Sequence, residues 1–245
     1  MATVISLKDI RRNFKVGSET VHALRGVSFD IEEGEFVTIM GTSGSGKSTL
    51  LNILGCLDTA SSGMYLLDGN SVSEMSKDER AILRNRKIGF VFQNYNLLSK
   101  TTAVENVELP LMYNSKVSSQ ERTERAVKAL QTVGLGNRLE HKSNQMSGGQ
   151  MQRVAIARAL VNNPAVILAD EATGNLDTRT SFEIIVLFQQ LHAEGRTIIF
   201  VTHNPELSKY STRNIFLRDG RVTEDTRNIN VEDASAVLAT LPKEE

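Results

Sequence analysis

Eight residues decide the fold of this chain: Gly41-Thr42-Ser43-Gly44-Ser45-Gly46-Lys47-Ser48. They match the pattern G-x-x-x-x-G-K-[ST] in full, between a predicted strand (Phe36–Met40) and a predicted helix (Lys47–Leu57). Glycines let the backbone N–H groups curl around a polyphosphate. Lys47 would then neutralise the β and γ phosphates, and Ser48 would offer its hydroxyl to Mg²⁺. The alternative is a plain turn rich in glycine and serine, but such a turn would not need Lys-Ser at a strand–helix junction.

A second signal is an apolar strand that ends in two carboxylates. Residues Ala165 to Ala169 form the predicted strand, and Asp170 and Glu171 follow it. Adjacent strand residues point to opposite sides, so the two carboxylates should do different jobs. Asp170 suits a water-mediated contact with Mg²⁺ in the phosphate site. Glu171 would lie where an attacking water arrives and would act as general base. Two solvated carboxylates at a strand end are the alternative reading.

Two further polar residues end predicted strands. Gln93 follows Ile88–Phe92, where a neutral amide can contact Mg²⁺ or water. His203 follows Thr197–Thr202, where an imidazole can hydrogen-bond to the γ-phosphate and orient the water. Taken alone, Gln93 would be an ordinary surface amide and His203 a structural histidine.

The segment Asn144 to Gln150 reads as a helix start. Ser147 is a good N-cap, Gly148 and Gly149 leave the backbone bare, and the helix continues through Gln150 to Asn162. A bare helix N-terminus, with unpaired N–H groups and a positive dipole end, can hold an anion. Most Ser-Gly-Gly stretches are only loops and caps, so this motif depends on its position between the phosphate loop and the acidic strand end.

Helices and strands alternate over most of the chain, which predicts a mostly parallel sheet covered on both faces. Ligands of such sheets bind at the carboxyl ends of the strands. Residues 94–163 differ because they read as helices without a strand, and we interpret them as an α-helical lobe inserted into an α/β core. The predicted elements not yet named are the strands Val4–Leu7, Ala23–Ile31, Met64–Leu67, Ile215–Leu217 and Arg221–Thr223 and the helices Lys77–Arg86, Ala103–Met112, Ser119–Val133, Thr178–Glu194 and Val231–Leu241, with Pro242–Glu245 expected to fray.

The composition is that of an ordinary globular protein: 245 residues, 40% hydrophobic and 23% charged, with a formal net charge of −1. The near-zero charge argues against nucleic acid as a partner. The single cysteine, Cys56, excludes an internal disulfide and a cysteine metal cluster, and its apolar neighbours predict a buried, inert thiol. Neither a signal peptide nor a run long enough to cross a bilayer is evident, so we expect a soluble, cytoplasmic chain that reaches the membrane only through a partner.

These motifs, in this order, resemble the ATPase subunit of ABC transporters over roughly Val4 to Val222. The resemblance implies a single P-loop NTPase domain of α/β class across residues 1–245. It would comprise a RecA-like parallel-sheet core with an antiparallel β subdomain (1–93 and 164–225), an inserted α-helical lobe (94–163) and a short C-terminal helix (231–241).

The family motifs fall on individual residues of this sequence. Gly41 to Ser48, with Thr49 beside it, resembles Walker A, and Gln93 resembles the Q-loop. Ser147-Gly148-Gly149-Gln150 resembles the signature, Ala165 to Asp170 Walker B, and Glu171 the catalytic glutamate. Gly174 to Asp177 resembles the D-loop and His203 the switch histidine. Phe14 is the best match for the aromatic ring that stacks on adenine. ATP and Mg²⁺ are the implied cofactors, with Ser48, Gln93 and Asp170 as candidate metal ligands and Glu171, His203 and Lys47 as the catalytic residues.

The resemblance also implies a head-to-tail dimer, with each ATP between Walker A of one copy and Ser147-Gly148-Gly149 of the other. The implied partner is an integral-membrane permease, which would hold the chain at the inner face of the cell membrane. Segments such as Ile53–Asp58, Glu105–Leu111 and Gly174–Asp177 look like the macrolide-exporter and lipoprotein-release group. We expect the permease to dock near Gln93–Leu98 and Thr101–Ala103.

Two residues depart from the family pattern. Met146 replaces the usual Leu of the signature, which is close to a volume-conserving change. Ala172 stands where Pro often follows the glutamate, and this removes a φ restraint next to Glu171. The rival functions are a soluble ABC-class ATPase acting on ribosomes or DNA, a non-ABC P-loop enzyme such as a small-molecule kinase, and a regulator that only binds nucleotide.

Overall fold

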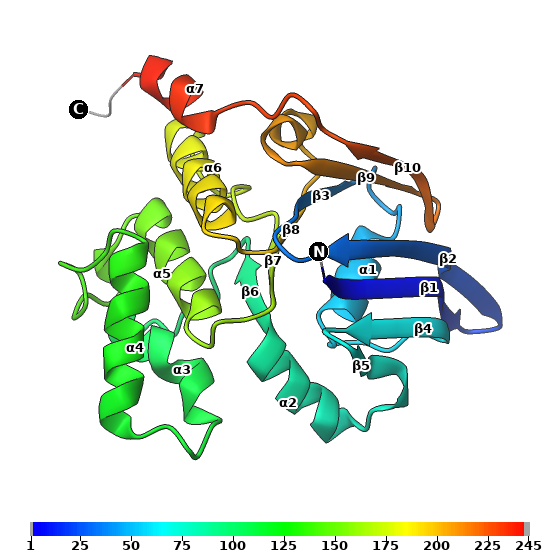
Figure 1. The fold of residues 1–245 in the computed structure, drawn as a ribbon, viewed down its shortest axis with the longest axis horizontal. Coiled ribbons are helices and arrows are strands. Elements are labelled where there is room, and N and C mark those ends of the chain that lie inside the picture. The colour runs from blue at the N-terminus through cyan, green and yellow to red at the C-terminus, as the bar shows by residue number, and fades with distance from the viewer. Residues whose placement is uncertain (1, 243–245) are drawn as a thin grey trace.

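The computed structural model describes residues 2–242 as an α/β fold with two sheets (Figure 1). Residue 1 and residues 243–245, which include most of the tail expected to fray, lie outside the described residues. The strands are β1 (Thr3–Val16), β2 (Glu19–Glu32), β3 (Phe36–Met40), β4 (Ser62–Leu67), β5 (Asn70–Ser71), β6 (Ile88–Phe92), β7 (Val166–Asp170), β8 (Ile198–Val201), β9 (Arg213–Arg218) and β10 (Arg221–Arg227). The α-helices are α1 (Lys47–Leu54), α2 (Lys77–Lys87), α3 (Ala103–Met112), α4 (Ser119–Thr132), α5 (Gly148–Leu160), α6 (Thr178–Ala193) and α7 (Ala234–Thr240). Three short 3₁₀ helices, which the sequence pattern did not predict, span Val72–Glu74, Ser143–Gln145 and Pro205–Tyr210.

The larger sheet has six strands in the order β10-β9-β3-β8-β7-β6. Every neighbouring pair from β9 to β6 is parallel, and β10 joins by an antiparallel hairpin that turns at Asp219-Gly220. The prediction of a mostly parallel sheet is therefore confirmed. All the parallel strands deliver their carboxyl ends to one edge.

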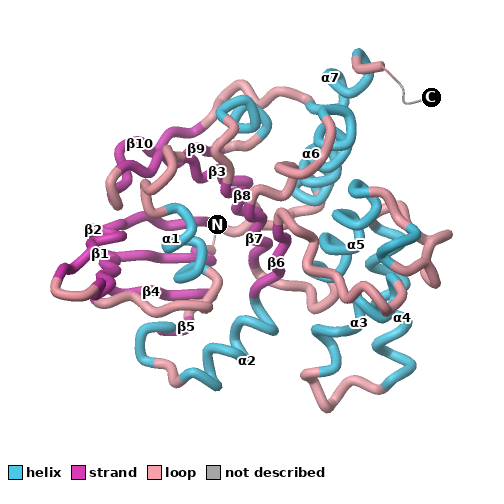
Figure 2. Tube along the Cα trace, turned by 180° about the vertical axis from the view of Figure 1, so that it is seen from behind, coloured by secondary structure: helices cyan, strands magenta, loops and turns pink. Residues whose placement is uncertain are grey.

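The two faces of this sheet contribute to separate hydrophobic cores, because successive strand side chains alternate between faces. On β7, for example, Ile167 and Ala169 pack into one core with α3 to α6, whereas Val166 and Leu168 pack into the other with α1 and the smaller sheet. Figures 1 and 2 show α1 and α5 on opposite sides of the sheet. This separation decides which motifs can meet within one chain.

The smaller sheet is antiparallel, with the order β2-β1-β4-β5. The predicted strands Val4–Leu7 and Ala23–Ile31 are parts of a hairpin in which each strand has 14 residues. Register shifts occur on either side of Ile10, and Asp9 has a left-handed φ of 49°. Beyond these bulges most side chains are exposed, so the alternation that marks a half-buried strand is lost and the sequence pattern ends too early.

Three helices, α3, α4 and α5, occupy residues 94–163, and this stretch contains no strand. Their starts follow from local capping: Thr102, Ser118 and Ser147 each accept a hydrogen bond from a backbone N–H of the first turn. Two helices elsewhere are shorter than predicted by at least three residues. Helix α1 ends at Leu54 because Cys56 adopts a left-handed φ of 53°, and α7 begins at Ala234 because Asp233 caps it.

Among residues 2–242, none of the helices combines the length and the apolar character that a bilayer crossing demands.

Candidate active site

Four neighbouring strands bring the predicted site residues to one edge of the larger sheet. The loop after β3 holds Gly41 to Gly46, β8 leads to His203, β7 ends in Asp170 and Glu171, and β6 leads to Gln93. Since β3, β8, β7 and β6 are consecutive and parallel, their carboxyl ends lie side by side. Segments up to about 160 residues apart in the sequence are thus combined into one site.

The phosphate loop turns on two glycines with left-handed backbone, Gly44 (φ 77°) and Gly46 (φ 105°), and Gly46 directly precedes α1. Such φ values are available to glycine at little cost. A Cβ at Gly41 would lie 2.2 Å from the Leu217 carbonyl oxygen, so the loop also needs a bare backbone there. Thr42, Ser43, Gly44 and Ser48 are exposed, Thr49 is half-buried and Ser45 is buried.

The Lys47 side chain folds back over its own loop. Its Nζ donates hydrogen bonds to the carbonyl oxygens of Gly41 (2.7 Å) and Thr42 (2.9 Å). The ammonium group is therefore held among backbone groups of the loop, where a polyphosphate would meet both the positive charge and the N–H groups at the start of α1.

The two carboxylates at the end of β7 have different surroundings. Burial raises the pKa of Asp170, the charge of Glu171 raises this pKa further, and Lys47 lowers it. Glu171 has a left-handed φ of 45°, and its N–H donates to the Val201 carbonyl of β8 (2.8 Å). The Glu171 Oε1 lies 2.7 Å from Nδ1 of His203. The predicted base and the predicted switch histidine are therefore joined by a hydrogen bond. The sequence placed each residue at the end of a strand but did not predict this contact.

Gln93 is bound to the loop that follows Glu171. Its Nε2 donates to Oδ1 of Asn175 (3.1 Å), and Nδ2 of Asn175 donates to the Gln93 carbonyl (3.2 Å) and to Oδ1 of Asn94 (2.8 Å). Asn175 lies in the stretch Gly174 to Asp177 that resembles the D-loop, and its hydrogen bonds to Gln93 and Asn94 were not predicted. The strands β6 and β7 were both predicted to end in site residues, and this could have suggested that the loops after them, which hold Gln93 and Asn175, lie in contact.

The segment Ser147 to Gln150 lies across the sheet from α1. Ser147 Oγ accepts from the Gln150 N–H, and Gln150 Oε1 accepts from the Ser147 N–H, forming a capping box. The glycines that follow are tightly packed in this chain. A Cβ at Gly148 would lie 2.9 Å from the Tyr95 hydroxyl oxygen, and one at Gly149 would lie 2.4 Å from Cγ2 of Thr180. Packing is thus one reason for both glycines.

Phe14 lies on β1 with 37% of its surface exposed. The guanidinium carbon of Arg12 lies 4.5 Å from the centroid of its ring. Arg12 is itself fixed by two hydrogen bonds to the Asp58 carboxylate, at 2.8 and 2.9 Å. One face of the ring is therefore covered by a cation, and a flat ligand would stack on the opposite face.

Comparison with known proteins agrees with this arrangement. A family model described as "ABC transporter" matches residues 24–174. The chain belongs to the ABC transporter family. An ABC transporter ATP-binding protein of Thermotoga maritima is 56% identical over 91% of this chain and 94% of its own length. The ATP-binding cassette MJ0796, solved as a dimer bound to ADP and Pi, is 45% identical, with a TM-score of 0.82, over 91% of this chain and 98% of that one.

A second kind of relative is larger. The macrolide export ATP-binding/permease protein MacB of Syntrophobacter fumaroxidans is 52% identical over 91% of this chain but only 32% of its own length. The chain thus spans about a third of these MacB relatives. As a member of the family, this ABC ATPase binds and hydrolyses ATP, and it has the fold expected of a P-loop ATPase cassette.

The donor set of this ABC ATPase fits Mg²⁺. Among residues 2–242 there is no group of three or more His, Cys, Asp or Glu side chains that could hold a metal ion by itself. Asp170, Ser48 and Gln93 offer a carboxylate, a hydroxyl and an amide oxygen. These are hard oxygen ligands of the kind that Mg²⁺ takes in small number, together with water and substrate phosphates.

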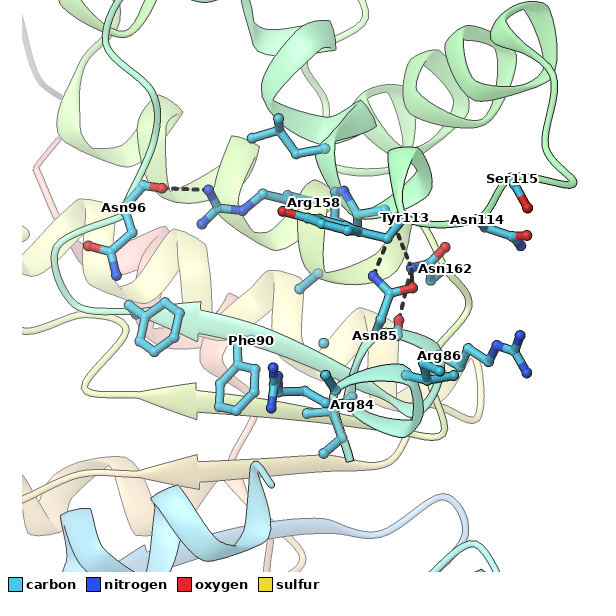
Figure 3. A pocket seen from close by; sticks show the side chains of 18 of the residues that line it. Arg84, Asn85, Arg86, Phe90, Asn96, Tyr113, Asn114, Ser115, Arg158 and Asn162 are labelled. Atoms are coloured by element: carbon cyan, nitrogen blue, oxygen red, sulfur yellow. Dashed lines mark hydrogen bonds between the residues drawn. The ribbon is translucent and has the colours of Figure 1, made fainter. Parts of the chain in front are cut away.

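Beside the site, a groove of 780 Å³ lies between α2 and β6 on one side and α3 and α5 on the other (Figure 3). Its floor contains the stacked rings of Phe90 and Phe92, and Tyr113 at its rim is exposed. The expected docking stretches contribute only Asn96 to its lining. Leu97 instead packs against the hydrophobic core of the helices. The apolar residues of Gln93–Leu98 are therefore partly internal, and most of the groove lining comes from α2, β6 and the loop that follows α3.

Proposed function

We propose that two copies of this chain bind two ATP molecules with Mg²⁺ in a head-to-tail dimer and that hydrolysis drives a separate integral-membrane subunit. The observation that carries this proposal is the division of motifs between the two sides of the sheet. Lys47, Asp170, Glu171 and His203 belong to one edge, whereas Ser147 begins a helix on the other side. A second copy is the natural source of the Ser147-Gly148-Gly149 segment.

In this proposal each residue has a defined task. Lys47 and the N–H groups from Gly41 to Thr49 bind the β and γ phosphates. Ser48, Asp170 and Gln93 would hold the Mg²⁺, which neutralises phosphate charge and fixes the geometry of the phosphates. Glu171 accepts a proton from the attacking water. His203, which is hydrogen-bonded to Glu171, orients this water. The face of the Phe14 ring opposite to Arg12 stacks on adenine.

The backbone N–H groups after Ser147, in the partner copy, contact the phosphates from the opposite side. The similar proteins support this proposal: MJ0796 was solved as a dimer, and MacB is a macrolide export ATP-binding/permease protein.

The groove is the proposed docking surface for the membrane subunit, which would place the chain at the inner face of the cell membrane. Four cations line it, namely Arg84, Arg86, Lys116 and Arg158, and within the described part of the chain no aspartate or glutamate does. Arg84 and Arg158 already donate to backbone carbonyls, whereas Arg86 and Lys116 are exposed. We further propose that residues 94–163 move as a lobe against the core (1–93 and 164–225), so that a segment held in this groove moves with them.

A mixing experiment tests the composite site. Lys47→Ala removes the phosphate-binding cation, and Ser147→Arg blocks the N-terminus of α5 at an exposed position. Each variant alone should be inactive. A mixed dimer would contain one site built from the intact Walker A of the Ser147→Arg copy and the intact signature of the Lys47→Ala copy. We therefore expect mixing to restore ATP hydrolysis, and a mixture as inactive as its components would contradict the composite site.

Membrane vesicles of the source cells, stripped of peripheral proteins, test the docking surface. Wild-type chain should bind them saturably. The pair Arg86→Glu and Lys116→Glu should lose binding, whereas the matched charge reversal Lys8→Glu and Lys128→Glu, at exposed positions outside the groove, should keep it. Equal binding by both pairs would exclude the groove, and binding that survives protease treatment of the vesicles would point to lipid rather than a membrane protein.

A further inference from the structure

The side-chain amide of Asn175 is fully engaged with the loop that follows β6. Its Oδ1 accepts a hydrogen bond from Nε2 of Gln93 at 3.1 Å. Its Nδ2 donates to the Gln93 carbonyl at 3.2 Å and to Oδ1 of Asn94 at 2.8 Å. An asparagine in a loop usually bonds to its own or adjacent backbone. Asn175 instead reaches residues that lie 81 and 82 positions away in the sequence.

This contact determines which end of the Gln93 amide is free. A glutamine side chain carries one carbonyl oxygen and one NH₂ group, and rotation by 180° exchanges them. Because the NH₂ group donates to Asn175, the Oε1 atom is the end left over, and no hydrogen bond to it from the described residues is present. An oxygen can bind a cation such as Mg²⁺, whereas an amide NH₂ cannot.

The neighbouring glycine leaves room for this arrangement. A Cβ at Gly174 would lie 2.7 Å from Nε2 and 3.2 Å from Cδ of Gln93, so a side chain there would displace the amide. Gly174 and Asn175 therefore act on the same group, since one provides space for it and the other fixes its direction.

We propose that Asn175 is a positioning residue that holds Gln93 with its amide oxygen available to Mg²⁺. This inference rests on the proposed function, because it takes Gln93 as a metal ligand. Groups that orient a ligand without touching the metal can change metal affinity by about 10–100-fold. We place Asn175 at the lower end, since it fixes only one of several oxygen ligands.

The experiment measures binding rather than turnover. The probe is a fluorescent ATP analogue, titrated with Mg²⁺ to find the half-saturating concentration and measured again in excess chelator. Asn175→Ala should raise the half-saturating Mg²⁺ concentration roughly tenfold and leave binding in chelator unchanged, because the phosphate loop is intact. Asn230→Ala is the matched control, an exposed loop asparagine outside the site. An unchanged Mg²⁺ requirement in Asn175→Ala would overturn the inference.

A second background separates positioning from a general structural role. Glutamate at position 93 has two carboxylate oxygens, so both orientations of its side chain offer an oxygen to Mg²⁺. Asn175→Ala should therefore have little effect in the Gln93→Glu protein. An equal loss in both backgrounds would mean that Asn175 only supports the loop. Gln93→Ala separates failure of the metal role of Gln93 from failure of the positioning role of Asn175. If it also leaves the Mg²⁺ requirement unchanged, the proposed metal role of Gln93 fails, whereas a clear effect of Gln93→Ala with a silent Asn175→Ala refutes the positioning role alone.

Discussion

Two reasons could require a glycine at position 149: packing against Thr180 within the chain, and bare backbone facing the nucleotide of a second copy. The contact between Gly149 and Thr180 allows the two to be tested separately. In Gly149→Ala the new Cβ would lie 2.4 Å from Cγ2 of Thr180, whereas carbon atoms in ordinary contact are about 3.5–4.0 Å apart. Overpacking of this kind costs about 1–3 kcal/mol. Alanine recovers up to about 1 kcal/mol through its higher helix propensity. We therefore expect a net loss of about 0–3 kcal/mol for Gly149→Ala alone.

Thr180→Ser removes the atom that clashes. The next atom, Cβ of residue 180, lies 3.8 Å from the added methyl group, which is a normal contact. In a double-mutant cycle followed by urea unfolding, the coupling free energy should be about 1–3 kcal/mol and should favour the double variant. A coupling below about 0.5 kcal/mol would refute the packing argument.

The same four proteins test the functional reason. If Gly149 must also present bare backbone to the nucleotide of a second copy, the double variant should regain stability but not ATP turnover. Recovery of wild-type turnover would show that packing alone requires this glycine.

Three further predictions concern individual side chains. Glu171→Gln should keep ATP binding and lose hydrolysis by roughly 10²–10⁴-fold in a phosphate-release assay, and near-normal turnover would exclude Glu171 as the base. The raised pKa of Asp170 means that the folded state binds a proton more tightly than the unfolded state, so the ionised carboxylate costs stability as pH rises above its ordinary pKa of about 4. Asp170→Asn should therefore raise the melting temperature of the nucleotide-free protein at pH 7, with a gain that shrinks toward pH 4, and a pH-independent difference would contradict this. Burial raises the pKa of Cys56 to about 11, so a thiol reagent at pH 8 should react slowly with folded protein and quickly in denaturant, and rapid labelling of the folded chain would contradict the burial.

Much of the fold could be predicted because its signals are local. The strands β3 and β6 and the helix α3 have the predicted boundaries. Most of the remaining α-helices start within one residue of their predicted first residue. A capping residue such as Thr102 or Ser147 acts on N–H groups only a few positions away, so its effect can be read from a short window. The extended β1–β2 hairpin was missed because an exposed ribbon loses the alternation of polar and apolar residues.

The sequence by itself determined the chemistry available to this ABC ATPase and the order in which it occurs along the chain. Gly41 to Ser48, Gln93, Asp170, Glu171 and His203 were predicted as site residues from residue type and from their positions at strand ends. Those positions alone imply a common edge, because parallel strands share their direction.

Only the tertiary structure decided which side chains meet. The Glu171–His203 hydrogen bond, the engagement of Gln93 by Asn175 and the tight fit of Gly149 against Thr180 all join residues more than 30 positions apart in the sequence. Such contacts depend on strand order and on how closely α5 approaches α6, and no local pattern of residues carries that information. The physical reason is that local hydrogen bonding sets where helices and strands begin, whereas the packing of the whole sheet sets which of their ends lie within 3 Å of one another.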